Sequence, residues 1–139
     1  MIFHFAKFHE TRGMAVLEIG VVLGADYQQF AQASSKLSGI DLTERAVEHT
    51  RRRLKSFDLD SNLIVGDAGN LLCSDKSFDV VYSWGFIHHS PDTKSAIREV
   101  FRVLKFGGVA RIMIYHKWST WIHALVSLWL DANEAVPIA

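Results

Sequence analysis

Two glycines and one aspartate have the spacing that a nucleotide-binding site requires. Gly20 and Gly24 follow a short apolar run, residues 15–19, and glycine there lets the backbone turn tightly and approach a ligand closely. Asp41 ends a second apolar run about 20 residues later, where a carboxylate can accept hydrogen bonds from both hydroxyls of a ribose. The order of strand, glycine turn, helix, strand and acid is typical of a βαβ unit that binds a nucleoside-containing ligand.

A pair of histidines forms a second candidate group. His88 and His89 follow the apolar segment 84–87, and paired histidines suggest acid–base chemistry or metal binding. We expect no metal site, because few cysteines and aspartates lie near the pair in the sequence. A role in a substrate pocket and a plain loop position both stay open, and the turn Ser90-Pro91-Asp92 favours the loop.

Length, charge and composition limit the function classes. The chain has 139 residues, which is the length of one domain, and is 49% hydrophobic. It carries 15 Lys and Arg against 15 Asp and Glu, so no global field attracts nucleic acid or anionic membranes. The local basic cluster at 45–55 has no interleaved aromatic residues and is interpreted as a solvated helix face. We therefore expect no nucleic-acid partner.

A lone cysteine and the absence of targeting patterns indicate a cytoplasmic protein. Cys73 has no partner for a disulfide and is expected to be an incidental, half-buried thiol. The first residues lack the basic and apolar regions of a signal peptide. No apolar run reaches the roughly 20 residues that cross a bilayer, so we expect no integral membrane segment.

Short β-branched runs alternate with helical patterns along the chain. We expect strands at 15–19, 36–40, 62–65, within 77–84 and at 109–115, and helices at 26–32, from 43 onward and at 93–104. Asp26 and Thr43 are candidate N-caps. The alternation predicts an α/β fold, a Rossmann-like doubly wound parallel sheet of about five strands flanked by helices. We expect a lead-in at 1–14, the main domain at 15–116, and an apolar helix and tail at 117–139.

The apolar spacing also predicts which helix residues face the core. They are Ala46, Val47, Leu54 and Phe57 in the second helix, and Ile97, Val100, Phe101, Val103 and Leu104 in the third. The third helix is expected to stop at Phe106-Gly107-Gly108.

The polar candidates fall where strands end. Gly20, Asp41, Asp67 and the pair Ser83-Trp84 all follow predicted strands. The carboxyl ends of parallel strands lie at one edge of a sheet, and ligands bind there at the switch in strand order. We therefore expect these residues to meet in one crevice.

Five motifs, in this order, resemble those of the class I S-adenosylmethionine-dependent methyltransferases. They are Glu18-Ile19-Gly20-x-x-x-Gly24, Gly39-Ile40-Asp41-Leu42, Gly66-Asp67-Ala68, Phe78-Asp79-Val80-Val81-Tyr82 and Leu104-Lys105-Phe106-Gly107-Gly108. The resemblance runs from about Val16 to Tyr115. The subgroup that the chain is most similar to includes the ubiquinone and menaquinone biosynthesis methyltransferases.

The resemblance implies a role for each residue that follows the first two strands. The loop from Gly20 to Gly24 would hold the methionine part of S-adenosylmethionine. Glu18 would point toward the site from the strand end, because an unpaired buried carboxylate is costly. Asp41 would bind the ribose hydroxyls, and Leu42 would offer an apolar face to the adenine. The alternatives are an ordinary tight turn at the glycines and an N-cap role for Asp41.

The resemblance also assigns residues after the third and fourth strands. Asp67 would accept a hydrogen bond from the adenine amino group, with Ala68 packed nearby; otherwise Asp67 is a solvated loop acid. Ser83 and Trp84 would line the methionine and sulfonium region.

The expected activity is transfer of a methyl group to a small-molecule acceptor by in-line displacement. The sulfonium is already activated, so the protein mainly positions the two partners and excludes water. Trp84 or Tyr82 can stabilise the sulfonium by a cation–π contact, and His88 or His89 is the candidate base if the acceptor must lose a proton. The apolar candidates for an acceptor pocket are Trp84, Phe86, Ile87 and Trp121.

Two departures from the family pattern support an alternative, a truncated or degenerate non-catalytic relative. Val22 stands where the family usually has a glycine, and a β-branched residue resists positive φ. After Tyr115 the chain lacks the usual final antiparallel strand pair, which leaves the fifth strand as an open edge. That edge, or the apolar stretch 118–130, could mediate self-association. The stretch could also form a lid or lie at a membrane interface, with core or lid packing favoured.

A third class is a nicotinamide-dependent oxidoreductase, because the same βαβ unit and Asp41 would serve that cofactor. The spacing of Gly20 and Gly24 does not fit Gly-x-Gly-x-x-Gly, and Asp67 would have no role there.

Overall fold

Five parallel strands form one sheet in the order β3-β2-β1-β4-β5, which confirms the predicted fold class. The structure is a computed structural model, and it describes residues 2–115. The strands are β1 (Ala15–Ile19), β2 (Lys36–Asp41), β3 (Asn62–Val65), β4 (Phe78–Trp84) and β5 (Leu104–Met113). The central strands β1 and β4 are neighbours although they lie far apart in the sequence.

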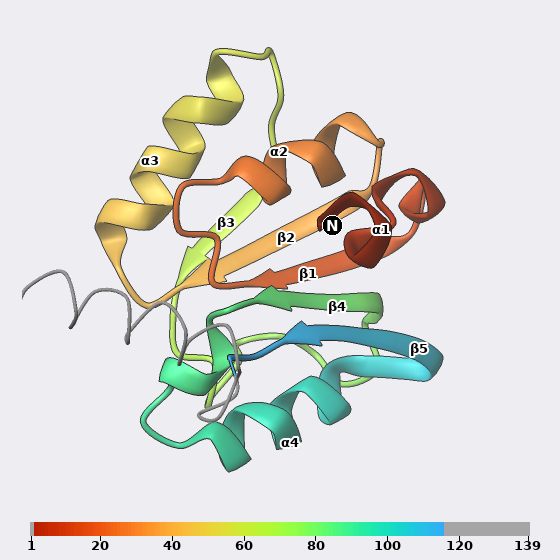
Figure 1. Cartoon of the computed structure of the whole chain (residues 1–139), viewed down its shortest axis with the longest axis vertical. Coiled ribbons are helices and arrows are strands. Elements are labelled where there is room, and N and C mark those ends of the chain that lie inside the picture. The colour runs from red at the N-terminus through yellow and green to blue at the C-terminus, as the bar shows by residue number, and fades with distance from the viewer. Residues whose placement is uncertain (1, 116–139) are drawn as a thin grey trace, which may run out of the picture.

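Helices cover both faces of this sheet. The α-helices are α1 (Ile2–Ala6), α2 (Ala25–Gln32), α3 (Glu44–Lys55) and α4 (Thr93–Val103), and the short 3-10 helices are η1 (Phe8–Thr11) and η2 (Ile87–His89). Figure 1 shows α4 beside β4 and β5, separated by the strands from α2 and α3. The doubly wound arrangement follows, because each face of an apolar parallel sheet must be covered.

Two apolar cores result, one on each face of the sheet. The first packs α4 against the sheet and includes Leu17, Ile19, Ile40, Val81, Ile87, Ala96, Val100 and Val103. The second packs α1, η1, α2 and α3 against the opposite face and includes Ala6, Phe8, Val16, Tyr27, Phe30, Leu54, Val80 and Tyr82. Neighbouring residues of β1 and β4 belong to different cores, because successive side chains of a strand point to opposite faces.

The start of α3 agrees with the sequence, and the start of α2 does not. Thr43 is the N-cap of α3, and its hydroxyl accepts a hydrogen bond from the N–H of Ala46. The predicted N-cap role of Asp26 is wrong, because Gly24 holds that position in a left-handed conformation. Asp26 lies inside the first turn of α2, and its carboxylate accepts a hydrogen bond from the Tyr82 hydroxyl at 2.7 Å.

The predicted boundary between α4 and β5 is also wrong. The strand begins at Leu104, directly after the helix, because Leu104 already pairs with Phe78. The glycines do not stop the helix. Gly107 has φ +77° inside an irregular stretch of β5, where the register moves from the Leu104–Phe78 pair to Val109 opposite Val80. Glycine permits this left-handed residue within a strand.

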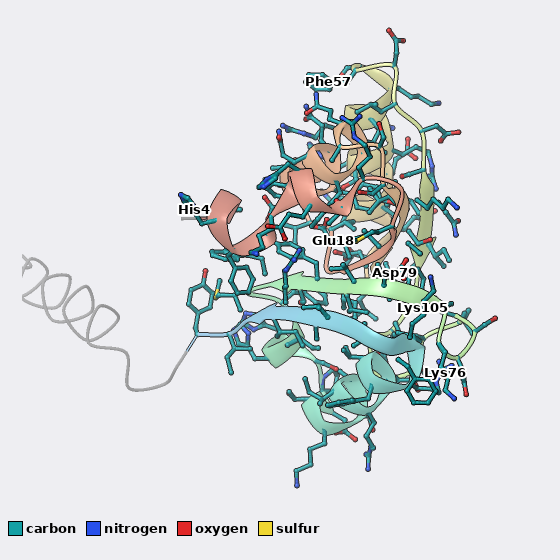
Figure 2. The ribbon with its side chains drawn as sticks, turned by 90° about the vertical axis from the view of Figure 1, so that its right-hand side faces the viewer. His4, Glu18, Phe57, Lys76, Asp79 and Lys105 are labelled. Carbon is teal, nitrogen blue, oxygen red and sulfur yellow. The ribbon has the colours of Figure 1, made fainter. Side chains whose placement is uncertain are left out.

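Asp79 holds that irregular stretch to the neighbouring strand. Its carboxylate accepts hydrogen bonds from the backbone N–H of Ala15 and from the Lys105 ammonium, both at 2.8 Å. Figure 2 shows Asp79 and Lys105 at the same end of the sheet. The motif that contains Asp79 therefore contributes a structural contact at the amino ends of the strands, away from the predicted site.

Two aromatic residues expected in the core are exposed. Phe57 lies beyond the end of α3 with 48% of its surface accessible, and Figure 2 shows it at the periphery of the domain. Phe101 on α4 is 76% exposed, while Val100 and Val103 are buried. Successive helix residues are rotated by about 100°, so residues 100, 101 and 103 cannot all face the sheet. The face of α4 that packs on the sheet consists of Ala96, Val100 and Val103, which leaves Phe101 toward solvent.

The lead-in segment forms α1 and η1, and a hydrogen bond joins it to the edge strand β5. The Arg111 guanidinium of β5 donates a hydrogen bond to the carbonyl of Ala6 at 2.7 Å. Within residues 2–115, β5 pairs only with β4, so its outer edge is open there and self-association through it stays a prediction. The predicted C-terminal helix at 117–139 lies outside the described residues. None of the helices formed by residues 2–115 is long and apolar enough to cross a bilayer.

Candidate functional site

The strand order creates a crevice at the carboxyl ends of β1 and β4. The chain leaves β1 toward β2 on one side and leaves β4 toward β5 on the other, so the two connections part at this point. Ligands of doubly wound sheets bind at such a switch. The loop after β1 carries Gly20 and Gly24, and the loop after β4 carries Gly85 and Phe86.

Three residues of the loop after β1 have left-handed backbone. Gly20 has φ +84°, Val22 has φ +45° and Gly24 has φ +71°, and the N–H of Gly24 closes a turn on the carbonyl of Val21 at 2.7 Å. The predicted conflict at Val22 is real, because this conformation is strained for a β-branched residue. The loop therefore keeps the backbone shape of a glycine loop at the expense of strain in one valine.

Asp41 ties this loop to the start of α3. The Asp41 side chain is 3% exposed. One carboxylate oxygen accepts a hydrogen bond from the N–H of Val22 at 3.1 Å, and the other accepts from both the N–H and the hydroxyl of Thr43 at 3.0 Å. Asp41 is not the N-cap of α3; that role belongs to Thr43, and Asp41 instead joins two elements that surround the crevice.

A first pocket of about 290 Å³ opens on the glycine loop. It unites four of the predicted residues, which are Glu18, Gly20, Gly24 and Trp84. The remaining lining residues are Ile2, Val21, Val22, Leu23, Ala25 and Asp26. The sequence prediction that Glu18 faces the site is therefore consistent with the structure.

Glu18 is the most unusual side chain in this pocket. It is 4% exposed, lies in the interior of the domain in Figure 2, and its Oε2 atom has no hydrogen-bond partner within residues 2–115. Burial raises the pKa of Glu18 well above its ordinary value, and the nearby negative charge of Asp26 raises it further. A buried carboxyl oxygen without a donor is costly unless a ligand supplies one.

A second, smaller pocket of about 30 Å³ unites the residues expected around the adenine. Leu42, Asp67 and Ala68 line it together with Phe86 and His89, and Ser90 and Pro91 complete the lining. Leu42 is 56% exposed and Ala68 is buried. Asp67 accepts a hydrogen bond from the N–H of Gly69 at 2.8 Å, which orders the loop after β3.

Phe86 lies against the loop between the two pockets. A Cβ atom added to Gly20 would come within 2.1 Å of Cγ of the Phe86 ring, so the ring rests directly on the bare backbone of Gly20. Because Phe86 also lines the second pocket, its ring borders the path from one pocket to the other. A ligand that spans both pockets must share this space with the ring.

Several predicted residues lie outside both pockets. Ser83 is completely buried, its hydroxyl has no hydrogen-bond partner among residues 2–115, and it does not line the first pocket, so its place beside the methionine region stays a prediction. Tyr82 is also fully buried and bonded to Asp26, which leaves Trp84 as the aromatic candidate for a cation–π contact. Ile87 is buried in the core and lines neither pocket, so its acceptor role stays a prediction, and Trp121 lies outside the described residues.

The two histidines face different surroundings. Their rings are 4.0 Å apart, and the His88 ring also contacts that of Tyr115 at 5.5 Å. Nδ1 of His88 is buried and has no hydrogen-bond partner in the part of the chain that the structure describes. Burial, assisted by the charge of His89, lowers the pKa of His88. His89 lines the second pocket, whereas His88 lines neither. Among residues 2–115, no three His, Cys, Asp or Glu side chains are grouped as a metal site.

An ion-pair network on α4 fixes the loop that carries Asp67 and Ala68. The guanidinium of Arg102 donates to both carboxylate oxygens of Glu99 and to the carbonyls of Leu71 and Cys73, all between 2.7 and 2.9 Å. Glu99 in turn accepts a hydrogen bond from the N–H of Leu71. Asp75 also pairs with Arg102 at 2.6 Å, so the loop from β3 to β4 is held without a helix of its own.

Sequence reasoning missed Asp26 as a site residue and gave Phe86 only an acceptor role. The sequence predicts a capping role for Asp26, although an acid in the first turn after a glycine loop can also point back toward the loop. The position of Phe86 over Gly20 has no sequence signal, because it depends on how the loop after β4 folds across β1.

Comparisons with known proteins agree with this geometry. A family model described as a methyltransferase domain matches residues 16–108. The chain is 35% identical over 99 residues to 27-O-demethylrifamycin SV methyltransferase of Amycolatopsis mediterranei, covering 69% of this chain and 36% of that protein. It is 31% identical over 100 residues to a sterol 24-C-methyltransferase of Aspergillus fumigatus, covering 70% and 26%. The solved YcgJ protein of Bacillus subtilis superposes with a TM-score of 0.70 at 30% identity, covering 75% of this chain and 45% of that one.

The chain thus spans about a third of the length of the curated relatives it matches. These relatives do not single out the ubiquinone and menaquinone subgroup, which stays an expectation. The family model, however, covers well over half of the chain and all of the strands that form the crevice. The chain therefore belongs to the class I S-adenosylmethionine-dependent methyltransferases, and S-adenosylmethionine is its cofactor.

Proposed function

We propose that this chain is the cofactor-binding domain of an enzyme that moves the methyl group of S-adenosylmethionine to a small-molecule acceptor by in-line displacement. The observation that carries the proposal is the buried, unpartnered Oε2 of Glu18 in a pocket walled by the glycine loop. The methionine part of the cofactor bears an ammonium group that can donate the missing hydrogen bond.

The remaining candidate cofactor-binding residues are divided between the two pockets, except Asp41 and Ser83, which line neither. The methionine part would lie in the first pocket beside Gly20, Gly24 and Trp84, and the adenine would lie in the second pocket between Leu42, Asp67 and Ala68. Asp41 would bind the ribose between them. The Asp41 oxygen that bonds Val22 accepts only one protein hydrogen bond, so it retains a lone pair for a ribose hydroxyl.

S-adenosylmethionine, when bound, supplies a methyl group already activated on a positive sulfur. The protein's contribution is orientation and exclusion of water. Trp84 would place its ring against the positive charge. Phe86 would cover the cofactor from the side of the loop after β4, which excludes water from the reacting atoms.

An acceptor that must lose a proton needs a base, and the two histidines are the candidates. Burial holds the pKa of His88 below its ordinary value, which favours the neutral form that can accept a proton. His89 borders the second pocket. Both histidines are therefore proposed as candidate bases.

The acceptor is proposed only as a small molecule. The two curated relatives named above methylate an oxygen and a carbon, as their names state, so this domain does not determine the acceptor atom. We also propose a cytoplasmic location, supported by the single cysteine of the chain.

Calorimetric titration of the chain with S-adenosylmethionine and with S-adenosylhomocysteine tests the proposal. We expect micromolar binding of both, and loss of binding in Asp41→Ala. The matched control is Asp60→Ala, an exposed aspartate outside both pockets, which should bind as the wild type does. A folded wild-type chain that binds neither ligand would overturn the proposal.

A further inference from the structure

Asp26 is a second carboxylate in the pocket that holds Glu18, and the proposed function does not use it. It comes from the first turn of α2, lines the pocket with the glycine loop, and is only partly buried. It lines the same pocket as Glu18, and its negative charge raises the pKa of Glu18 further after burial. Two acidic side chains therefore reach one small pocket from different elements, β1 and α2.

Tyr82 fixes the direction of Asp26. The hydroxyl of Tyr82 donates to Oδ2 of Asp26 at 2.7 Å, across 56 residues of sequence. Tyr82 is fully buried and its ring is enclosed by the rings of Phe5, Phe8 and Phe30. Because this ring cannot move freely, the Asp26 carboxylate is held in place before any ligand arrives. Among residues 2–115, the Tyr82 hydroxyl bonds Oδ2 and no side chain or backbone N–H donates to Oδ1.

The charge of the pocket indicates what it binds. Its ten lining residues include two acids and no Lys, Arg or His. The Oε2 atom of Glu18 is buried and lacks a donor in the same pocket. A pocket with this lining is complementary to a cation that carries several N–H donors, and an ammonium group has three.

We propose that Asp26 binds the α-ammonium group of the cofactor's methionine part together with Glu18, and that Tyr82 is the positioning residue for Asp26. This inference rests on the proposed function, because it assigns one end of the same ligand. It makes Asp26 a determinant of affinity for the amino-acid part of the cofactor and leaves the adenosine part to Asp41 and the second pocket.

Two ligands separate these parts. S-adenosylhomocysteine carries the ammonium group, whereas 5′-methylthioadenosine has the same adenosine and a thioether but no amino-acid part. We expect Asp26→Asn to weaken S-adenosylhomocysteine binding by about tenfold or more, the effect of one charged hydrogen bond, and to leave 5′-methylthioadenosine binding unchanged. Asparagine keeps an oxygen that can accept from Tyr82, so this variant should fold.

Tyr82→Phe provides an independent measurement. It keeps the buried ring and removes only the donor, so S-adenosylhomocysteine affinity should fall by less than in Asp26→Asn, again without a change for 5′-methylthioadenosine. Glu44→Gln is the matched control, because it removes the same charge at an exposed position of α3 outside the pocket. Asp26→Glu keeps the carboxylate, so an affinity for S-adenosylhomocysteine higher than that of Asp26→Asn, with no change for 5′-methylthioadenosine, would support the proposal further.

The outcomes are distinct. A selective loss for S-adenosylhomocysteine supports the inference. An equal loss for both ligands, or no loss for either, overturns it while the wild-type titration still supports the proposed function. Failure of the folded wild-type chain to bind S-adenosylhomocysteine overturns the proposed function and this inference with it.

Discussion

The carboxylate of Asp41, at the end of β2, accepts a hydrogen bond from the backbone N–H of Val22, in the loop after β1, at 3.1 Å. This contact joins the acid expected to hold the ribose to the residue that departs from the family's glycine pattern. A residue with positive φ points its N–H in a different direction from a residue with negative φ. The hydrogen bond to Asp41 therefore depends on the strained left-handed conformation of Val22.

Asp41→Asn should destabilise the chain by about 2 kcal/mol, because the amide nitrogen would face the N–H of Val22 or of Thr43 in place of an acceptor. Urea unfolding followed by circular dichroism measures this. Asp67→Asn is the control, since the exposed Asp67 carboxylate bonds only one loop N–H, and its loss should stay below about 1 kcal/mol. If Asp41→Asn and Asp67→Asn lost the same free energy of unfolding, the buried hydrogen bonds of Asp41 would contribute no more than the single exposed bond of Asp67.

Val22→Gly should stabilise the chain by about 1 kcal/mol, the relief of left-handed strain less the extra entropy of glycine in the unfolded state. The same urea experiment applies. Leu23→Gly is the matched control at the next position, where φ is not positive, and it should cost about 0.5–1 kcal/mol. If both variants lose stability alike, the strain at Val22 has been overestimated.

Glu18→Gln should change how stability depends on pH. In the unfolded chain Glu18 ionises near its ordinary value of 4.5, whereas burial raises its pKa in the folded chain, so the folded form keeps its proton longer. As pH rises above 4.5, ionisation of Glu18 therefore stabilises the unfolded state while the folded state keeps its proton. The free energy of unfolding falls by about 1.4 kcal/mol per pH unit until the pH reaches the folded pKa.

The glutamine variant lacks this loss, so its stability should exceed that of the wild type increasingly between pH 5 and pH 8 and match it near pH 4. Thermal unfolding across that range is the measurement. The titratable neighbours of Glu18 are Asp26, Tyr27 and Tyr82, and burial raises the pKa of both tyrosines, so neither tyrosine changes charge in this window. Parallel pH curves for the two proteins would contradict the assignment.

Arg102→Met should destabilise the chain by about 2 kcal/mol and loosen the loop from β3 to β4, because it removes charged hydrogen bonds to Glu99, Leu71 and Cys73 at once. Hydrogen exchange of residues 66–77 reports the loosening. Arg98→Met is the control on the same helix. Arg98 contacts only the Ser95 hydroxyl through an exposed bond, so its loss should be below about 0.5 kcal/mol.

The sequence alone determined the order of the elements and the edge at which the site lies. The bounds of β1 and β3 agree with the expectation. Gly20 and Asp67 follow strands, and Asp41 and Trp84 are the last residues of β2 and β4, so all four lie at carboxyl ends of strands as expected. This information is local: apolar periodicity, turn residues and caps act over a few positions. The fold class followed because short buried strands that alternate with helices have few ways to pack.

Only the tertiary structure decided which of these residues meet. Glu18, Asp26 and Trp84 share one pocket because β1, α2 and β4 converge there, and Tyr82 reaches Asp26 across 56 residues. Phe57 and Phe101 are exposed against expectation for the same reason, since the burial of a side chain depends on what packs against its face. Contacts between distant segments have no local pattern in the sequence, and the charge and shape of the pocket arise from those contacts.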